Sequence, residues 1–199
     1  MLATGTLQGT PAGGLFGRVN ELARDTAWLH APLQAYAAYG VVLFAALLVL
    51  GWWTTRDRGP RTTAAALWAA AGTLLAVAVN QPLVNGVHEA RPYTAHPGIL
   101  VLAHRSVDFS FPSDHAVMAG AVAAGLWLVS RRLGAVATIA ALLMAFARVY
   151  VAAHYPHDVI AGLALGAGVV LLGWVLVAVP LTRLTEALAR TPLRPLVSV

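Results

Sequence analysis

The stretch Val159-Ile-Ala-Gly-Leu-Ala-Leu-Gly-Ala-Gly-Val-Val-Leu-Leu-Gly-Trp-Val-Leu-Val-Ala-Val-Pro180 decides the fold, because it contains no charged, amide or hydroxyl side chain. A hydrocarbon core about 30 Å thick needs about 20 helical residues to cross it. Backbone amides in hydrocarbon must find their partners within their own segment. A run of this length and composition therefore predicts a membrane-spanning α-helix.

Four further apolar stretches precede this run: Leu33–Trp53, Thr63–Val84, His115–Val129 and Leu133–Val151. The third of these is short, and we expect it to gain length from residues around Ser113. Only 11% of the 199 residues are charged and 59% are hydrophobic, whereas a soluble domain has about a quarter charged residues. The sequence predicts an all-α fold, a polytopic membrane helix bundle with about five transmembrane helices and a lipid bilayer around it.

The segments that flank the spans differ in character. Residues 15–25 place apolar side chains at helical spacing between charged ones, which predicts an N-terminal amphipathic helix in the membrane interface, with an ordinary solvated helix as the alternative. Residues 1–14 are rich in Gly and Thr without the layout of a signal peptide, and we expect them to be disordered. Residues 15–180 would form the membrane domain, and 181–199 a cytoplasmic C-terminal tail.

All 13 basic residues are arginines, and eight of them lie in three segments that five spans would put on one side of the membrane. These are Arg56, Arg58, Arg61, Arg131, Arg132, Arg183, Arg190 and Arg194. Short arginine-rich loops stay cytoplasmic, so the loop from 88 to 112 and the loop around His154 would face outward from the inner (plasma) membrane. Arginines scattered between apolar runs do not form a nucleic-acid-binding face.

The two outward loops contain nearly all the unusual polar residues, and ionisable groups at membrane depth usually mark function. Ser113 directly precedes an apolar helix and suits an N-cap. Its hydroxyl and the free N–H groups of that helix would face an anion. Arg91 and Arg148 can each donate two parallel hydrogen bonds to phosphate oxygens. These groups predict a phosphate-binding pocket between the loops.

Three further residues could act on a bound phosphate. His154 and Asp158 are four residues apart, so on a helix they would share a face and the carboxylate would hold the imidazole in one tautomer. His115 supplies a second imidazole from the other loop. Histidine can act as a covalent nucleophile, and arginines stabilise charge on a transferring group. Together with the arginines, these residues are typical of a phosphoryl-transfer site.

Several alternatives remain open for these residues. Arg91 and Arg148 could extend to the membrane interface without binding a ligand, and His104 and His157 could contact headgroups or water. A divalent metal would find acceptable ligand types in His115, His154, His157 and Asp158. Two fixed arginine charges favour an anion over a cation in the same pocket. We therefore predict neither a metal nor another cofactor.

The polar residues resemble the signature of the type 2 phosphatidic acid phosphatase (PAP2) superfamily, whose parts are K-x6-R-P, P-S-G-H and S-R-x5-H-x3-D. Arg91-Pro92 matches the end of the first part. The second part is similar to Pro112-Ser-Asp-His115, with Asp114 in place of glycine. The third matches Arg148, His154 and Asp158 at identical spacing, with Ala147 in place of serine.

The resemblance implies a role for each matching residue. His154 would be the nucleophile that forms a phosphohistidine, Asp158 would orient it, and His115 would protonate the leaving oxygen. Phosphate would be bound by Arg91, Arg148 and Ser113, with Asp114 beside them, and no metal would be needed.

The chain departs from the family pattern at the motif lysine. Val84 stands at that position, and the chain contains no lysine. Arg105 and His88 are candidates for the missing phosphate contact. Glu89, next to the arginine, is also unexpected, and we predict that it pairs with an arginine or favours the charged form of a histidine.

The Pro-Ser-Asp-His form resembles bacterial undecaprenyl pyrophosphate phosphatases of the bacitracin-resistance type, which implies a polyprenyl (undecaprenyl or decaprenyl) diphosphate as the membrane lipid substrate. Phosphatidate or phosphatidylglycerophosphate is the alternative substrate. A non-catalytic protein that binds or flips lipid phosphates is the alternative of another class, although binding alone would not need His154, Asp158 and His115 together. The apolar spans argue against the soluble vanadium haloperoxidase branch of the superfamily.

Overall fold

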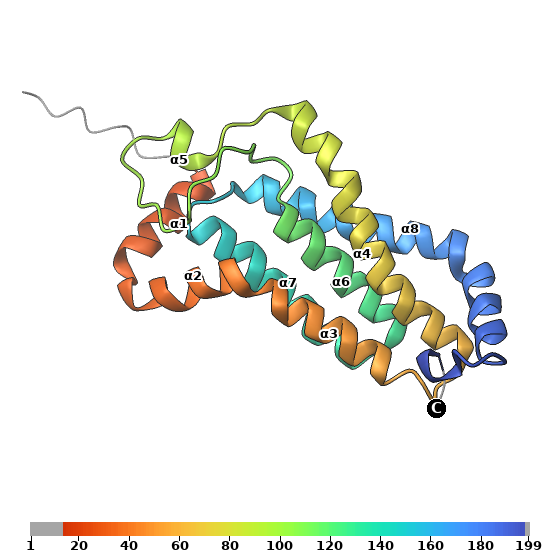
Figure 1. Ribbon diagram of the computed structural model, residues 1–199. Coiled ribbons are helices and arrows are strands. Elements are labelled where there is room, and N and C mark those ends of the chain that lie inside the picture. The colour runs from red at the N-terminus through yellow and green to blue at the C-terminus, as the bar shows by residue number, and fades with distance from the viewer. Residues whose placement is uncertain (1–13, 198–199) are drawn as a thin grey trace, which may run out of the picture.

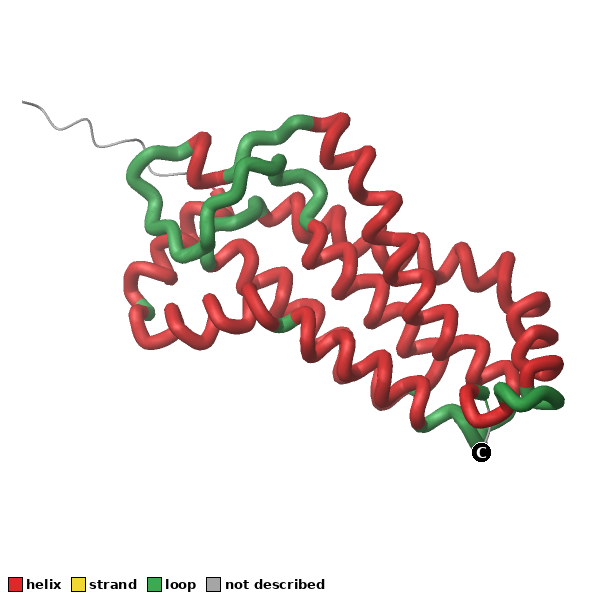
Figure 2. The backbone as a smooth tube through the Cα atoms, viewed as in Figure 1, coloured by secondary structure: helices red, strands yellow, loops and turns green. Residues whose placement is uncertain are grey.

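The computed structural model describes residues 14–197, and within them the chain forms helices and loops without a strand (Figure 1; Figure 2). The elements are α1 (Gly14–Asp25), η1 (Ala27–Leu29), α2 (His30–Tyr39), α3 (Val41–Trp53), α4 (Pro60–Val87), α5 (Pro92–Ala95), α6 (Asp114–Val129), α7 (Arg131–Tyr150), α8 (Pro156–Leu188) and η2 (Arg194–Leu196). The expected all-α class is confirmed. The predicted disorder of the N-terminus falls on residues 1–13, outside the described part, and on Gly14, which begins α1.

The bundle is built from the pair α2–α3 and from α4, α6, α7 and α8. Helices α4, α7 and α8 are long and apolar enough to cross a membrane, and the bent pair α2–α3 would be a fourth span. Helix α6 is apolar but has only 16 residues, and it contacts α4, α7 and α8. Each predicted apolar stretch therefore contains helix, and the membrane helix bundle is confirmed.

The prediction of one continuous helix over Leu33–Trp53 is wrong, because the chain bends by 54° at the junction of α2 and α3. A Cβ on Gly40 would lie 2.5 Å from the carbonyl oxygen of Tyr36 and 2.6 Å from Cε of Met144. The Tyr36 hydroxyl also donates a hydrogen bond to the carbonyl of Ala140, at 2.8 Å. The glycine at the bend thus lies in close contact with both α2 and α7, and local hydropathy does not encode these contacts.

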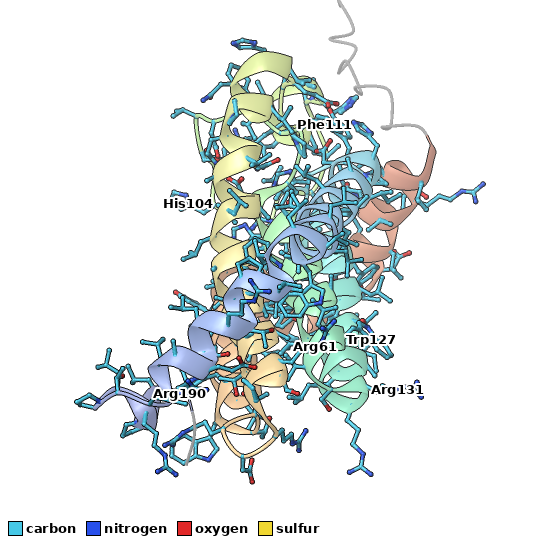
Figure 3. The ribbon with its side chains drawn as sticks, turned by 90° about the vertical axis from the view of Figure 1, so that its right-hand side faces the viewer. Arg61, His104, Phe111, Trp127, Arg131 and Arg190 are labelled. Carbon is cyan, nitrogen blue, oxygen red and sulfur yellow. The ribbon has the colours of Figure 1, made fainter. Side chains whose placement is uncertain are left out.

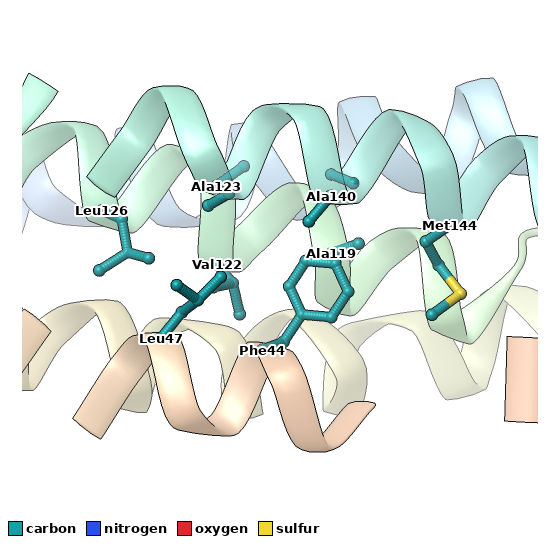
Figure 4. Packing of buried hydrophobic residues seen from close by; sticks show 10 residues of the cluster. Phe44, Leu47, Ala119, Val122, Ala123, Leu126, Ala140 and Met144 are labelled. Carbon is teal, nitrogen blue, oxygen red and sulfur yellow. The ribbon is translucent and has the colours of Figure 1, made fainter. Parts of the chain in front are cut away.

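Close packing fixes α6 against its neighbours. Apolar side chains of α3, α6 and α7 form one core cluster (Figure 4), made of Phe44, Leu47, Ala119, Val122, Ala123, Leu126, Ala137, Ala140, Ala141 and Met144. Between α6 and α8 the backbones themselves touch, since a Cβ on Gly166 would overlap the Val117 carbonyl oxygen and one on Gly120 would overlap that of Leu163. Small residues permit such approach between membrane helices.

Residues 88–113 and 151–155 lie together at one end of the bundle, which we call the loop end (Figure 1). The amides of Leu102 and Ala103 donate to the carbonyl of Val151 at 3.1 and 2.9 Å. Two connectors distant in sequence are therefore hydrogen-bonded to each other.

The arginine-rich segments lie at the opposite end. Figure 3 shows Arg131 and Arg190 far from His104 and Phe111, which belong to the loop end. The connectors α3–α4 and α6–α7, together with the residues after α8, meet here (Figure 1). The sidedness expected from the arginines thus corresponds to two distinct ends of the bundle.

Helix α1 corresponds to the predicted amphipathic helix, and its apolar face is buried through Phe16 and Ala23. Asn20 exchanges two hydrogen bonds with the backbone of Leu100, one donated by its Nδ2 at 2.7 Å and one accepted by its Oδ1 at 3.0 Å. Arg24 donates to the carbonyl of Gly98 at 2.6 Å. Helix α1 therefore anchors the long loop, while its place in the membrane interface stays a prediction.

The segment predicted as a tail from Leu181 begins as helix, because α8 continues through Pro180 and ends at Leu188. The hydroxyl of Thr185 donates to the carbonyl of Pro60 at 3.0 Å. The end of α8 is thus tied to the start of α4.

Candidate active site

The three motif segments meet at the loop end around a cavity of about 260 Å³. Arg91 follows α4, His115 lies in the first turn of α6, Arg148 lies in the last turn of α7, and His154 stands between α7 and α8. The cavity is lined by Val84, Arg91, His104, Ser106, Asp108, Phe109, Pro112, Asp114, His115, Arg148 and His154. The structure therefore brings both arginines and both motif histidines to one pocket.

The imidazole of His154 is buried and bonded at both nitrogens. Its Nδ1 lies 2.8 Å from the carbonyl oxygen of Ser110, which can only accept, so Nδ1 carries the proton. Its Nε2 lies 3.1 Å from Nη1 of Arg91, which can only donate, so Nε2 presents its lone pair. Burial is the main cause that lowers the pKa of His154 to about 4, helped by the charges of Arg148 and Arg91. The ring is neutral near pH 7.

Asp158 lies beside this ring but is held by other partners. Its Oδ2 is 3.4 Å from Nδ1 of His154, and it accepts hydrogen bonds from the hydroxyl of Ser110 at 2.5 Å and from the amide of Tyr155 at 2.8 Å. His154 precedes α8, so the two residues do not share a helix face, although their side chains do lie next to each other. The turn before α8 and Ser110 bring the two side chains together instead.

That turn has an unusual backbone. Ala152 has a φ of 61°, in the left-handed region, which costs a non-glycine residue about 1–2 kcal/mol. The amides of Ala153 and His154 both donate to the carbonyl of Arg148, at 3.0 and 3.3 Å. The end of α7 thus places the histidine one turn from the arginine of the same motif.

The two arginines differ in their surroundings. Arg91 donates from Nη1 to the carbonyl of Ala153 at 3.0 Å and from Nη2 to Oδ2 of Asp108 at 2.9 Å. Arg148 donates to the carbonyl of Ala37 at 3.3 Å, and its Nε is buried without a hydrogen-bond partner. Arg91 is therefore held rigidly, whereas Arg148 has an unused donor that an anion could satisfy.

Asp108 occupies one donor of Arg91. Burial acts to raise the pKa of Asp108, but the hydrogen bond from Ser106 and the charge of Arg91 outweigh it and hold the pKa below its usual value. A carboxylate therefore stands where a phosphate oxygen could bind Arg91. Nothing in the sequence motifs indicates this residue.

Ser113 and Asp114 start α6 in different roles from those expected. Ser113 is at the N-cap position, but its hydroxyl makes no capping bond and is buried without a partner, outside the cavity lining. Asp114 does line the cavity, and its Oδ1 accepts hydrogen bonds from Asn80 at 2.6 Å and Gln81 at 2.9 Å. The aspartate in place of the motif glycine is thus anchored to α4.

The residues expected to assist lie outside the cavity. The guanidinium of Arg105 lies over the ring of Tyr93 at 5.7 Å, and His88 packs on Phe109 with ring centroids 4.5 Å apart. Glu89 is hydrogen-bonded to His157 at 2.9 Å.

At the position of the motif lysine, Val84 forms part of the cavity wall. His104, expected to contact only headgroups or water, lines the cavity instead. Like Ser106 and Asp108, it is a cavity-lining side chain with hydrogen-bonding capacity that the motifs did not indicate.

The alternative metal set of His115, His154, His157 and Asp158 is not assembled. Within residues 14–197, His157 groups with Glu89 and Asp158. His154 and His115 face the cavity with the two arginines.

Comparison with known proteins identifies the family. A family model described as the PAP2 superfamily matches residues 65–180. The chain belongs to the PAP2 superfamily. It is 27% identical over 149 residues to undecaprenyl-diphosphatase BcrC of Bacillus subtilis, covering 75% of each protein. It is 36% identical over 111 residues to a decaprenylphosphoryl-5-phosphoribose phosphatase of Mycobacterium tuberculosis, covering 55% of this chain and 60% of that protein.

Two solved structures share the fold of this PAP2 protein. LpxE of Aquifex aeolicus superposes with a TM-score of 0.58 at 21% identity, covering 83% of this chain and 98% of that one. A PAP2-type phosphatidylglycerolphosphate phosphatase of Bacillus subtilis gives a TM-score of 0.61 at 22% identity, covering 87% and 85%. The predicted resemblance, the membrane fold and the phosphatase class are confirmed.

Proposed function

We propose that this PAP2 phosphatase hydrolyses a polyprenyl diphosphate to the monophosphate at the outer face of the membrane, through a phosphohistidine on His154. The observation that carries the proposal is the state of the His154 ring. Its Nδ1 is bonded to Ser110 and its Nε2 lone pair faces Arg91 in the cavity. A neutral imidazole with a fixed tautomer is a competent nucleophile once its lone pair is released from the hydrogen bond that Arg91 donates to it.

In the first step, Nε2 of His154 attacks the terminal phosphorus of the diphosphate. The bond between that phosphorus and the bridging oxygen breaks, and His115 donates a proton to the leaving oxygen of the lipid monophosphate. Arg91 and Arg148 stabilise the charge on the transferring oxygens. Phosphate would have to replace Asp108 at Arg91 and would give the unused Nε of Arg148 a partner.

In the second step, water attacks the phosphohistidine. His115, now without its proton, takes one from the water, and the bond between phosphorus and Nε2 breaks. Inorganic phosphate leaves, and His154 regains its lone pair. The Ser110 carbonyl and Asp158 stabilise the positive ring while it carries the phosphoryl group, because both are acceptors near Nδ1.

An apolar cavity of about 400 Å³ supports a lipid substrate. It lies between α3, α4 and α6 and reaches the catalytic cavity at Asp114 and His115, which line both. Its remaining lining residues are Val41, Phe44, Ala45, Leu48, Thr73, Leu74, Val77, Met118 and Val122. A hydrocarbon chain would bury its surface here while its phosphates face the arginines. The similarity to an undecaprenyl-diphosphatase supports a polyprenyl chain.

The charges in the cavity support a reaction without a metal cofactor. Arg91 and Arg148 are fixed positive groups that already neutralise phosphate, and they oppose the entry of a free cation. The arginine-rich segments at the other end of the bundle support an outward-facing loop end. We therefore propose a multi-pass protein of the inner (plasma) membrane with an extracytoplasmic active site.

The test measures inorganic phosphate released by the purified protein in EDTA from undecaprenyl diphosphate, phosphatidate and phosphatidylglycerophosphate. We expect the diphosphate to be preferred and His154→Ala to abolish turnover while lipid binding persists. Preference for phosphatidate would overturn the substrate assignment. Wild-type protein that binds these lipids but hydrolyses none would instead identify a lipid-phosphate binding or flipping protein.

A further inference from the structure

Three side chains that could coordinate a metal ion converge at the loop end, beside His154. The atoms Oε1 of Glu89, Nε2 of His157 and Oδ1 of Asp158 all lie within 4.8 Å of one another. Nε2 of His157 is 2.9 Å from the glutamate oxygen and 3.1 Å from the aspartate oxygen. The cluster joins the loop after α4 to the first turn of α8.

One of these atoms is an unsatisfied buried group. The side chain of Asp158 is 0% exposed, and its Oδ1 has no hydrogen-bond partner, although Oδ2 is fully engaged by Ser110 and Tyr155. Buried carboxylate oxygens are nearly always paired. Oδ1 makes no hydrogen bond, and it faces Nε2 of His157 at 3.1 Å, so the geometry places Oδ1 where it could coordinate a cation together with His157 and Glu89.

The imidazole of His157 is already oriented and accessible. Its ring stacks on that of Tyr155 at a centroid distance of 5.4 Å and an interplanar angle of 7°, and Phe111 lies 5.9 Å away. The side chain is nevertheless 58% exposed. A cation could reach the cluster from water without passing through the catalytic cavity.

We propose that Glu89, His157 and Asp158 bind a zinc-like divalent cation and that the bound cation suppresses phosphoryl transfer. One imidazole and two carboxylates suit Zn²⁺, whose bonds of about 2.0–2.2 Å place tetrahedral ligands roughly 3.3 Å apart. The observed separations of 2.9 and 3.1 Å need to open only slightly. Ca²⁺ and Mg²⁺ prefer more oxygen ligands, and water would complete the zinc sphere.

Suppression follows from the shared carboxylate and rests on the proposed function. A cation on Oδ1 of Asp158 withdraws charge from Oδ2, which stabilises the positive form of His154 during phosphoryl transfer. The transition state would lose part of that stabilisation. The site is separate from the phosphate-binding arginines and would act through Asp158.

Binding is tested in a protein that need not turn over. Purified full-length His154→Ala would be titrated with Co²⁺, and we expect visible absorption of a tetrahedral complex that Zn²⁺ displaces. Adding Glu89→Gln should weaken binding at least about tenfold, since even the loss of a residue that only supports a metal ligand costs about 10–100-fold in affinity. His88→Asn is the matched control and should bind normally. Absence of the complex, or equal affinity in the Glu89→Gln protein, would overturn the site.

Suppression is tested with His154 intact. Micromolar Zn²⁺ should lower the rate of phosphate release, and Glu89→Gln should raise the half-inhibiting Zn²⁺ concentration at least about tenfold. Each variant is compared with its own rate in EDTA. Equal inhibition of both proteins would indicate that Zn²⁺ complexes the diphosphate, and would overturn the regulatory role. If no phospholipid is hydrolysed, the proposed function fails, while the Co²⁺ titration still decides the site.

Discussion

At the scale of single residues, the His154 ring is controlled from both sides. The Ser110 carbonyl determines which nitrogen carries the proton, and Arg91 determines where the free nitrogen points. Asp158 supplies a negative charge at 3.4 Å, but its own position depends on the hydroxyl of Ser110. Ser110 therefore acts on the His154 ring through its carbonyl and on Asp158 through its side chain.

Ser110→Ala should lower kcat at least about tenfold with little change in KM. The substitution keeps the carbonyl that accepts from His154 but removes a hydrogen bond to a buried carboxylate, and such charged bonds contribute about 1.5–3 kcal/mol. Steady-state phosphate release measures both constants. Ser130→Ala, at the other end of the bundle, is the matched control. A change confined to KM would show that Ser110 acts on substrate binding rather than on His154 and Asp158.

The pH dependence should also report the state of His154. Because burial lowers its pKa to about 4, the proposed nucleophile is neutral near pH 7, and protonation of this group should lower kcat/KM only as the pH falls toward 4. For stability, the folded pKa lies below the ordinary value of about 6.5. The unfolded chain then binds more protons between these values, so stability falls as the pH drops from 6.5 to 4.

Phosphate release and detergent unfolding, both followed in EDTA from pH 4 to 8, check this expectation. A fall in kcat/KM centred near pH 6.5 would point to a solvated His154 ring if it persists when each of the other histidines is replaced. That result would contradict the buried, neutral nucleophile. His96→Asn serves as a histidine control at the same end of the molecule.

At the scale of elements, the active site depends on how closely α6 and α8 approach. These helices begin with the residues around His115 and Asp158, and they meet where Gly166 lies against the Val117 carbonyl. Gly166→Ala should reduce the free energy of unfolding by about 1–3 kcal/mol, the usual cost of overpacking, and should reduce turnover. In Gly168→Ala the added methyl group meets no atom within 4 Å. That control should be neutral or more stable by up to about 1 kcal/mol.

Unfolding of both variants in a denaturing detergent series measures the difference. Equal stability of the two proteins would mean that the helices can separate at Gly166 without cost. In that case the close crossing would not hold the catalytic residues in place.

The sequence predicted the features that depend on local composition and missed those that depend on contacts between distant residues. The apolar runs predicted α4, α6, α7 and α8, because transfer into hydrocarbon depends on composition alone. The break at Gly40 was missed, since the close contacts there, with the Tyr36 carbonyl and with Met144 of another helix, are not visible in the hydropathy. Motif spacing indicated Arg91, His115, Arg148 and His154, which line one cavity, whereas Ser113 lies outside that lining. Ser110 and Asp108 were not predicted, because their roles arise from loop geometry.

Asn80 is a polar residue within an apolar run, and this feature of the sequence could have indicated its role. It is a fully buried amide within an apolar span, and such residues in membrane helices usually have partners. Its bond to Asp114 ties α4 to the start of α6. His104 was set aside as a headgroup contact, since a loop of this length does not reveal which side chains turn inward.

At the scale of the whole molecule, the two ends carry different chemistry. The cavity with Arg91, Arg148 and the motif histidines lies at the loop end, and the arginine-rich connectors lie at the other end. The apolar cavity between α3, α4 and α6 reaches the cavity at the loop end. A lipid could therefore keep its hydrocarbon chain among the helices while its diphosphate enters the pocket at the loop end. Such an arrangement requires the loop end to lie at one membrane surface.

The chain contains no cysteine, so single cysteines can test which surface that is. Val107 at the loop end is fully exposed. Asp57, in the arginine-rich connector between α3 and α4 at the opposite end, is also exposed. We expect a membrane-impermeant maleimide to label Val107→Cys in intact cells, and Asp57→Cys only after the cells are opened, because short arginine-rich loops stay cytoplasmic. The reverse pattern would place the pocket on the cytoplasmic side and rule out hydrolysis at the outer face. Labelling of both positions in opened cells would show that both cysteines can react. Retained phosphate release would show that both variants are folded.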